Sequence, residues 1–312
     1  MRLSDSVAEY VTYKRALGMC FNTEAHLLAS FCRHLGDVSI ASITADEIQS
    51  YLDGETPVSS YWRRKHTALT GLYRFALARC YVTTSPFPFI CPRLPPPLVP
   101  YIYSTAELKR LLDATPAVCT RQVPFDANVL RNLLLLLYGA CLRPSEGRKL
   151  TMQDVDLDHA VLCIRATKFY KTRLVPLGKD LNTALNHYLQ QRNLTYADAP
   201  DAHLFCCREG QALSKSSLGS SFRRLRVAAG VKRQHDARYQ PRLHDLRHTG
   251  VVHRLLAWYR SGADLQRLLP QLATYLGHVD LSSTQHYLTL TPELLQEASL
   301  CFERYAMENH HE

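Results

Sequence analysis

The last quarter of the chain contains residues whose types and spacing suit chemistry at a phosphate group. His244 and Arg247 are three residues apart, and on a helix this spacing places an imidazole and a guanidinium on one face. His278 follows a Leu-Gly pair, and Tyr287 comes nine residues later. Together with an arginine far upstream, Arg143, these side chains could grip a phosphate and attack it with a phenol oxygen.

Cleavage of a phosphodiester makes three demands on these residues. The non-bridging oxygens gain negative charge in the transition state and need fixed positive donors, a role that suits planar guanidinium groups. The leaving oxygen needs a proton, which Lys168, between two predicted strands, could supply. A tyrosine can attack and form a covalent intermediate. Its phenol pKa of about 10 requires a nearby proton acceptor, such as His244.

A metal site is the first alternative explanation for the histidines. His244 and His248 have the i, i+4 spacing of metal ligands on a helix, and His253 follows closely. Arg247 lies between them, however, and would face or crowd a bound cation. We therefore predict no metal site here and no cofactor for the chain.

The other candidate residues also have ordinary structural explanations. Tyr287 could be a core aromatic residue, because the chain contains 17 tyrosines. Arg143 could form a surface ion pair with Glu146, an arrangement that is common and contributes little stability. The occurrence of all these residues in one chain favours the catalytic interpretation over each separate explanation.

Composition and charge narrow the class of protein. The chain has 312 residues, of which 46% are hydrophobic, enough for two ordinary domains. Its longest apolar run, Leu133 to Tyr138, is far shorter than the roughly 20 residues that span a bilayer. The polar N-terminal residues contain no secretory signal, so we expect a cytoplasmic protein with no membrane partner. The ten cysteines are scattered, which is typical of reduced, buried thiols.

The chain carries a net charge of +9, and its basic residues are concentrated in one stretch. Between Arg208 and Arg254 there are eleven lysines and arginines against three acidic residues. A one-signed excess of this kind favours contact with nucleic acid, although an ordinary solvated helical face is the alternative. The residues predicted to contact DNA in this stretch are Lys215, Arg223 and Arg224.

Residues 1–90 show helical spacing and no alternating strand pattern, so we predict an all-α DNA-binding domain there. The predicted helices run from Ser4 to Ala16, from Asn22 to about Leu35, from a capping box at Thr44 to about Gly54, and from Ser59 or Ser60 to Arg79.

The fourth of these helices combines basic and aromatic residues, a composition that suits a DNA groove and its phosphates. An amphipathic helix with an ordinary basic face is an equally good explanation of the pattern. The residues predicted to contact DNA here are Arg63, Arg64, Lys65 and Arg74.

Residues 91–102 are rich in proline, which favours extended chain, so we predict a linker between two domains. A linker of this length would allow the domains to lie on opposite sides of a DNA duplex. Residues 103–312 would form the second domain, with a capped helix start at Ser104, an apolar helix over 125–141, and short strands at 155–157, 160–164 and 173–177. The predicted fold class is mainly α: an all-α first domain, and an α+β second domain with a small antiparallel sheet.

The order and spacing of the motifs resemble those of the tyrosine recombinase/integrase family over most of residues 100–300. Each motif alone is weakly specific, but their combination in this order is strongly specific. The matching segments are Gly139-x-x-Leu142-Arg143-x-x-Glu146, the Lys168 hairpin that ends in Arg173-Leu174-Val175-Pro176-Leu177, His244-Asp245-Leu246-Arg247-His248-Thr249, Leu276-Gly277-His278 and Ser283-Thr284-Gln285-His286-Tyr287. The first domain resembles the family's core-binding domain in size and position alone.

The resemblance implies a site-specific DNA recombinase/integrase and a role for each matching residue. Tyr287 would be the nucleophile that forms a 3′-phosphotyrosyl link. Arg143 and Arg247 would clamp the scissile phosphate, and His278 would add a further donor. Glu146 would orient Arg143 or the general base without touching the phosphate.

The same resemblance implies the groups that move protons. His244 would be the general base, or a mainly positioning group. Lys168 would be the general acid toward the 5′-oxygen. Lys171 competes for this role, but Lys168 lies at the family position, five residues before Arg173. We also predict that Arg173 contacts DNA.

The resemblance further implies an assembly on DNA. Members of the family act without metal or ATP as tetramers on two duplexes. We therefore expect a homotetramer, or a heterotetramer with a related recombinase, on double-stranded DNA with inverted-repeat sites in the nucleoid. The domains would form a C-shaped clamp on DNA, and the tail from Glu293 to Ala306 resembles a helix that docks into a neighbouring subunit. Two alternatives remain: a DNA-binding protein of this fold without catalysis, and an enzyme like a type IB topoisomerase.

Overall fold

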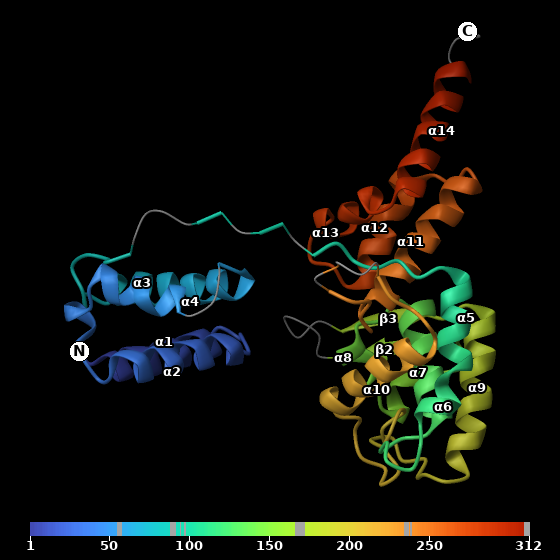
Figure 1. Ribbon diagram of the computed structural model, residues 1–312, viewed down its shortest axis with the longest axis horizontal. Coiled ribbons are helices and arrows are strands. Elements are labelled where there is room, and N and C mark those ends of the chain that lie inside the picture. The colour runs from blue at the N-terminus through green and yellow to red at the C-terminus, as the bar shows by residue number, and fades with distance from the viewer. Residues whose placement is uncertain are drawn as a thin grey trace. The chain divides into compact units, whose positions relative to one another are not determined.

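The computed structural model of the chain contains two compact units, Met1–Leu98 and Val99–Glu312 (Figure 1). It describes residues 1–54, 58–87, 92–93, 95–96, 98–165, 172–233, 237 and 239–308, with side chains described as far as residue 303 in the last helix. The DNA-binding and catalytic roles predicted for the two parts of the chain stay predictions.

The first unit is built from helices whose starts follow from local capping chemistry. The predicted capping box at Thr44 is confirmed, because its Oγ1 accepts from the Glu47 N–H at 3.3 Å and the Glu47 carboxylate accepts from the Thr44 N–H at 2.8 Å. Ser59 caps the last helix by accepting from the Trp62 N–H. The helices are α1 (Leu3–Ala16), α2 (Asn22–Leu35), α3 (Ala45–Asp53) and α4 (Ser60–Ala78), with a 3-10 turn at Ile40–Ser42. Their apolar faces enclose one core.

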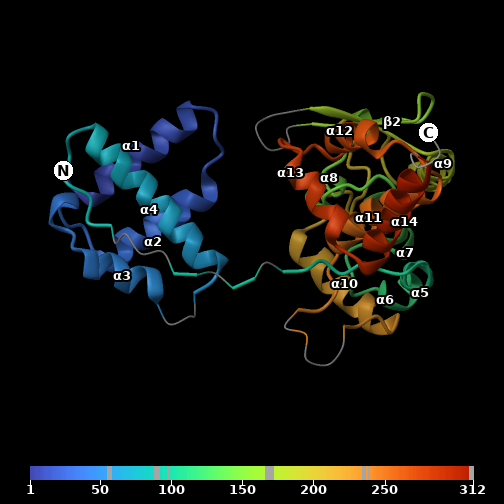
Figure 2. The ribbon, with the colours of Figure 1, turned by 90° about the horizontal axis from the view of Figure 1, so that it is seen from above.

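The second unit combines helices with one small sheet, which confirms the predicted fold class. Strands β1 (Val155–Asp156), β2 (Val161–Ile164) and β3 (Arg173–Pro176) are antiparallel in the order β1-β2-β3, with Leu162 opposite Val175. The helices are α5 (Thr105–Asp113), α6 (Thr115–Val118), α7 (Ala127–Gly139), α8 (Pro144–Gly147), α9 (Lys179–Asn193), α10 (Lys215–Ala228), α11 (Asp245–Arg260), α12 (Leu265–Leu276), α13 (Ser282–Gln285) and α14 (Pro292–Glu308), with 3-10 turns η2 (Met152–Asp154) and η4 (His286–Thr289). Helix α12 packs beside β3, and α14 packs on α11 (Figure 2).

Helix α7 lies at the centre of the core of the second unit. Leu130, Leu133, Leu136 and Leu137 are buried in this core, so the apolar run at Leu133–Tyr138 belongs to a helix that packs inside the unit. Helices α9 and α11 pack against it. Within the described part of the chain, no helix combines the length and the apolar character needed to cross a membrane.

Helices α7 and α11 approach each other closely at Gly250. A Cβ atom there would overlap the backbone carbonyl oxygen of Tyr138 and would lie 2.8 Å from Cys141 Sγ. Because a backbone carbonyl in a packed core cannot easily move aside, Gly250→Ala is expected to lower the free energy of unfolding by about 1–3 kcal/mol in denaturant titrations. The matched control is Gly219→Ala in α10, where a Cβ meets nothing within 4 Å and alanine should gain about 0.5–1 kcal/mol. Equal unfolding free energies for the two variants would contradict the close approach.

Candidate active site

Arg247 lies in the first turn of α11 and is almost completely buried, with 2% of its side chain exposed. Its Nη1 donates to the Cys141 carbonyl oxygen at 2.7 Å, and its Nη2 donates to the Leu276 carbonyl oxygen at 2.8 Å. The same Nη2 lies 3.2 Å from Nε2 of His278. The chain between α7 and α8 and the end of α12 therefore fix this guanidinium from two sides.

The contact with Arg247 assigns the protonation of His278. A guanidinium can only donate, so Nε2 of His278 must accept, and Nδ1 carries the proton of the neutral ring. Nδ1 then donates to Oγ1 of Thr284, 2.8 Å away in α13. Burial, and after it the charge of Arg247, lowers the pKa of His278 to about 4. The ring is therefore neutral at neutral pH.

Glu146 is the negative centre of an arginine cluster, which we define as Arg143, Arg173 and Arg247. Its carboxylate accepts from Nη1 of Arg143 at 2.7 Å and from both Nη atoms of Arg173 at 3.1 and 2.9 Å. Nη1 of Arg247 lies 3.9 Å from the same carboxylate. Burial would raise the pKa of Glu146, but the hydrogen bonds from Arg173 and Arg143 outweigh it and lower the pKa to about 2. The carboxylate therefore stays ionised among these guanidinium groups.

Arg143 immediately precedes α8, whose first residue is Pro144, a residue suited to the first helical turn. The backbone N–H of Arg143 donates to Glu146 Oε2 at 2.9 Å, so the Arg-x-x-Glu spacing lets Glu146 cap the N-terminus of α8. Its Nη2 lies 3.4 Å from the Gly277 carbonyl oxygen. Because 33% of its side chain is exposed, Arg143 can meet a ligand at the surface, whereas Arg247 is almost completely buried.

Arg173 takes a different place from the DNA contact that the sequence predicted. Its side chain is 9% exposed, and besides binding Glu146 its Nε donates to the Tyr275 carbonyl oxygen at 3.0 Å. Its donors are therefore directed into the protein. We reassign Arg173 from contact with DNA to holding Glu146 in place.

Tyr287 lies in η4 and is 4% exposed. Its hydroxyl oxygen is 2.9 Å from Nδ1 of His248, and its ring stacks on that of His278 with 6.3 Å between centroids and an interplanar angle of 12°. Burial raises the pKa of Tyr287, while the charge and hydrogen bonding of Arg247 act in the opposite direction. The phenol predicted as nucleophile therefore lies against two of the residues predicted to hold a phosphate.

His248, rather than His244, is the histidine in contact with this phenol in the described structure. His244 immediately precedes α11, and its ring meets that of His248 edge to face, with 4.8 Å between centroids. In the sequence, His248 stands out only as part of a motif and as an alternative metal ligand. The i, i+4 spacing of the two histidines did indicate one helix face, but it could not show which ring reaches Tyr287.

The remaining histidine of the alternative metal cluster has a partner of its own. Nδ1 of His253 lies 3.0 Å from the hydroxyl of Tyr138, whereas Nδ1 of His248 faces Tyr287. Across residues 1–308, apart from the undescribed segments, no group of three or more His, Cys, Asp or Glu side chains is arranged to hold a metal ion.

Lys168 and its competitor Lys171 both lie outside the described residues, between β2 and β3. The predicted strands on either side are confirmed as an antiparallel pair, with Ile164 opposite Arg173. The roles of Lys168 and Lys171 in proton transfer therefore stay predictions.

Most of the predicted DNA contacts on α4 and α10 are exposed. Lys65 is the exception, because its Nζ donates to the Tyr51 carbonyl oxygen at 2.6 Å. The same Nζ lies 4.4 Å from the centroid of the Tyr51 ring. The exposed members are Arg63, Arg64 and Arg74 on α4, and Lys215, Arg223 and Arg224 on α10.

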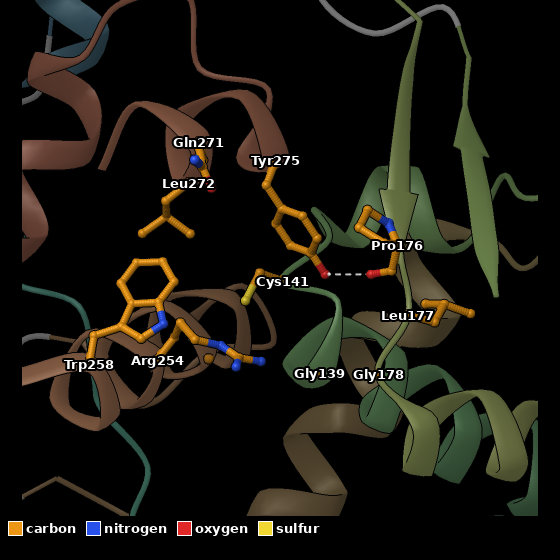
Figure 3. A pocket seen from close by; sticks show the side chains of 11 residues that line it. Gly139, Cys141, Pro176, Leu177, Gly178, Arg254, Trp258, Gln271, Leu272 and Tyr275 are labelled. Atoms are coloured by element: carbon orange, nitrogen blue, oxygen red, sulfur yellow. Dashed lines mark hydrogen bonds between the residues drawn. The ribbon is translucent and has the colours of Figure 1, made fainter. Parts of the chain in front are cut away.

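A cavity of about 340 Å³ lies next to the arginine cluster but is separate from it. Figure 3 shows Arg254 and Trp258 of α11 facing Tyr275 of α12 across it. The side chain of Cys141 lines the cavity, whereas its carbonyl oxygen accepts from Arg247. None of the described candidate catalytic residues lines this space, so we do not assign the phosphate to it.

Comparisons with known proteins place the chain in a family. The sequence profile of the phage integrase family matches residues 104–293. The protein y4rB of Sinorhizobium fredii, named as an integrase/recombinase, is 33% identical over 306 residues, which cover 96% of this chain and 96% of its own. Tyrosine recombinase XerA of Thermococcus kodakarensis is 35% identical over 212 residues, which cover 66% of this chain and 65% of its own.

Solved structures share the fold. The Tn1549 transposon integrase has a TM-score of 0.71 at 16% identity and covers 98% of this chain and 100% of its own. The XerH site-specific recombinase has a TM-score of 0.63 at 21% identity and covers 90% of this chain and 79% of its own. With the profile match over most of the second unit and a relative over nearly the whole chain, the chain belongs to the phage integrase family of tyrosine recombinases.

Proposed function

We propose that the chain is a site-specific recombinase that cuts and rejoins DNA through Tyr287. The phenol oxygen would attack a backbone phosphate, form a 3′-phosphotyrosyl bond and release a 5′-hydroxyl. A 5′-hydroxyl from another strand would later attack this bond and restore the DNA. The covalent link conserves the free energy of the phosphodiester and the arginines supply positive charge, so the proposed reaction needs neither ATP nor a metal ion.

The observation that carries this proposal is the meeting of a buried phenol with fixed phosphate-binding groups. Tyr287, Arg247 and His278 come from η4, α11 and the chain after α12, yet their side chains are in contact or adjacent. A phosphate oxygen can accept from Nη2 of Arg247 in place of Nε2 of His278. The negative charge of the phosphate would also favour a proton on Nε2, which would let His278 donate to it.

The other residues would support this centre. Arg143 would hold the exposed side of the phosphate, and Glu146 would fix its guanidinium. His244, whose pKa is lowered to about 4 by burial and by Arg247, would take a positioning role beside the phosphate. Lys168 would protonate the leaving 5′-oxygen, as the family resemblance implies, with Lys171 as the alternative donor.

We propose double-stranded DNA with inverted-repeat sites as the substrate, within the nucleoid. The exposed basic residues of α4 and α10 would contact its phosphates, and the two units would close on the duplex as a C-shaped clamp. In support, the solved relatives include XerH bound to a palindromic difH substrate and the Tn1549 transposon integrase in complex with a circular intermediate DNA. The second of these also supports a role for the chain in a mobile element. Because phosphate contacts would supply much of the affinity for DNA, this affinity would fall steeply as the salt concentration rises.

We also propose a tetramer on DNA, formed by this chain alone or with a related recombinase, in which α14 contributes to subunit contacts. The first half of α14 packs on α11, where Leu294 is buried and Glu297 accepts from Arg260 at 2.8 Å. The second half of α14 extends away from the rest of the second unit (Figure 1), and Phe302 in this half is 72% exposed. An exposed aromatic residue on a projecting helix suits contact with another subunit.

The two alternative functions are not favoured. A DNA-binding protein without catalysis would have no need for a tyrosine placed against a histidine and an arginine cluster. A topoisomerase-like enzyme would share the chemistry, but the relatives of this chain are named as integrases and tyrosine recombinases.

Covalent capture on DNA tests the proposal. The wild-type chain, in EDTA, would be incubated with a pool of nicked duplexes of randomised sequence, and adducts that survive denaturation would be isolated and sequenced. We expect adducts enriched in inverted repeats, their absence with Tyr287→Phe, and their persistence with the matched variant Tyr275→Phe. A wild-type chain that forms no adduct, or a Tyr287→Phe variant that still forms one, would refute the proposal.

A further inference from the structure

His248 contacts the hydroxyl of Tyr287 directly, although it is not one of the residues proposed above to hold the phosphate or move protons. Nδ1 of His248 lies 2.9 Å from the phenol oxygen, and the two ring centroids are 5.5 Å apart. Tyr287 is 4% exposed, so bulk water has little access to the phenol. A group that takes the phenolic proton during attack should therefore already be in contact with the hydroxyl.

The surroundings of the two rings decide which atom donates in this contact. Burial lowers the pKa of His248 to about 4, helped by His244 and Arg247, while Asp245 opposes the shift and Arg242 adds a little to it. The ring is therefore neutral at neutral pH and has one nitrogen free to accept. The phenol oxygen is approached by the guanidinium donor of Arg247. Its own hydrogen is then best directed at Nδ1 of His248.

His244 lacks this position in the described structure. Its ring contacts that of His248, with 4.8 Å between centroids, and the phenol oxygen is paired with His248. His244 thus contacts the ring of His248, but the described contacts give it no direct path to the proton of Tyr287.

We infer that His248 is the catalytic residue that orients the phenol of Tyr287 and accepts its proton through Nδ1. The inference rests on the proposed function and gives His248 the role that the family resemblance implied for His244. In this step the O–H bond of Tyr287 breaks, a bond forms between its oxygen and phosphorus, and the bond from phosphorus to the 5′-oxygen breaks. The phenolic proton moves to Nδ1, and the 5′-oxygen takes a separate proton from the general acid. Rejoining reverses both transfers.

Substitution with asparagine separates proton transfer from positioning. The asparagine amide oxygen can accept a hydrogen bond near the position of Nδ1 but cannot take up the proton. On a nicked duplex recovered by covalent capture, His248→Asn is expected to form the adduct about 100-fold more slowly than wild type, the lower end of the range for general base catalysis. His248→Ala should be at least as slow, and added imidazole should restore part of its rate.

Two histidines of the same region provide matched controls. His253→Asn alters the same kind of pair on the same helix, because Nδ1 of His253 lies 3.0 Å from the Tyr138 hydroxyl, and it should cleave at the wild-type rate. His244→Ala tests the competing residue, and its cleavage rate should not respond to imidazole. The inference is overturned if His248→Asn cleaves as fast as His253→Asn, or if imidazole rescues His244→Ala in place of His248→Ala.

A measurement without DNA distinguishes this inference from the proposed function. In protein labelled with ¹⁵N-histidine, the Nδ1 signal of His248, identified by its loss in His248→Asn, should be that of an unprotonated nitrogen and should shift in Tyr287→Phe. A protonated Nδ1 would overturn the inference even if the wild type forms adducts. Failure of the wild type to form any adduct would refute the proposed function, whereas the NMR result would still decide the direction of the hydrogen bond.

Discussion

Replacing Arg247 with alanine is expected to slow formation of the covalent adduct about 10³-fold while leaving DNA affinity nearly unchanged. Removal of one preorganised donor typically costs about 10²–10³ in rate, and a charged, buried donor belongs at the upper end. Affinity for DNA should come instead from many phosphate contacts on exposed basic residues, and one buried arginine adds little to it. Single-turnover cleavage and equilibrium binding on the same captured duplex would measure the two effects.

The controls for this prediction must separate chemistry from folding. Arg247 donates to the carbonyl oxygens of Cys141 and Leu276, so thermal unfolding of the variant has to be compared with wild type. Arg247→Lys keeps the charge but lacks the planar fork that reaches both carbonyls, and it should remain strongly impaired. Arg224→Ala, on the exposed face of α10, should weaken binding without a comparable loss in the cleavage step. A folded Arg247→Ala that loses binding and cleavage equally would contradict the assignment.

Glu146→Gln is expected to lower the free energy of unfolding at pH 7 by about 3 kcal/mol. The carboxylate is 9% exposed and holds the arginine cluster, so its loss leaves like charges together without their partner. The expected loss of stability follows from the pKa of Glu146. Folding lowers this pKa from 4.5 to about 2, which corresponds to roughly 3 kcal/mol at 1.36 kcal/mol per pKa unit. Denaturant unfolding would measure the change.

The pH dependence gives the same prediction an independent check. The folded-state pKa of Glu146 is lowered, so its stabilisation is fully present above the unfolded-state pKa near 4.5 and is lost as pH falls from 4.5 toward 2. Glu146→Gln should lose less stability than wild type over this window. Glu297→Gln, which breaks the more exposed pair with Arg260, is the matched control and should cost about 1 kcal/mol or less. If the two variants lost the same free energy of unfolding, the arginine cluster would not depend on Glu146.

Local sequence rules predicted much of the fold because they act within a few residues. The capping boxes at Thr44 and Ser104 and the antiparallel pair before and after Lys168 are all present, and each depends on neighbouring side chains or on strand alternation. The apolar run around Leu133 is a buried helix for the same reason. Family membership came from motifs that keep their order along the chain.

Contacts between distant segments could not be predicted in this way. Arg173 was expected to reach DNA, but the fold brings β3 against α8, and Glu146 takes both of its Nη groups. The role of His248 was missed because it depends on the rotation of α11 about its axis and on the placement of η4. Sequence spacing alone fixes neither quantity.

The most direct test of the central claim is to identify the residue that carries DNA in the adduct. The captured wild-type adduct would be digested with nuclease and protease, and the peptide that retains a nucleotide 3′-phosphate would be sequenced by mass spectrometry. We expect the nucleotide to be attached to Tyr287 through its phenol oxygen. Attachment to any other residue would refute Tyr287 as the nucleophile.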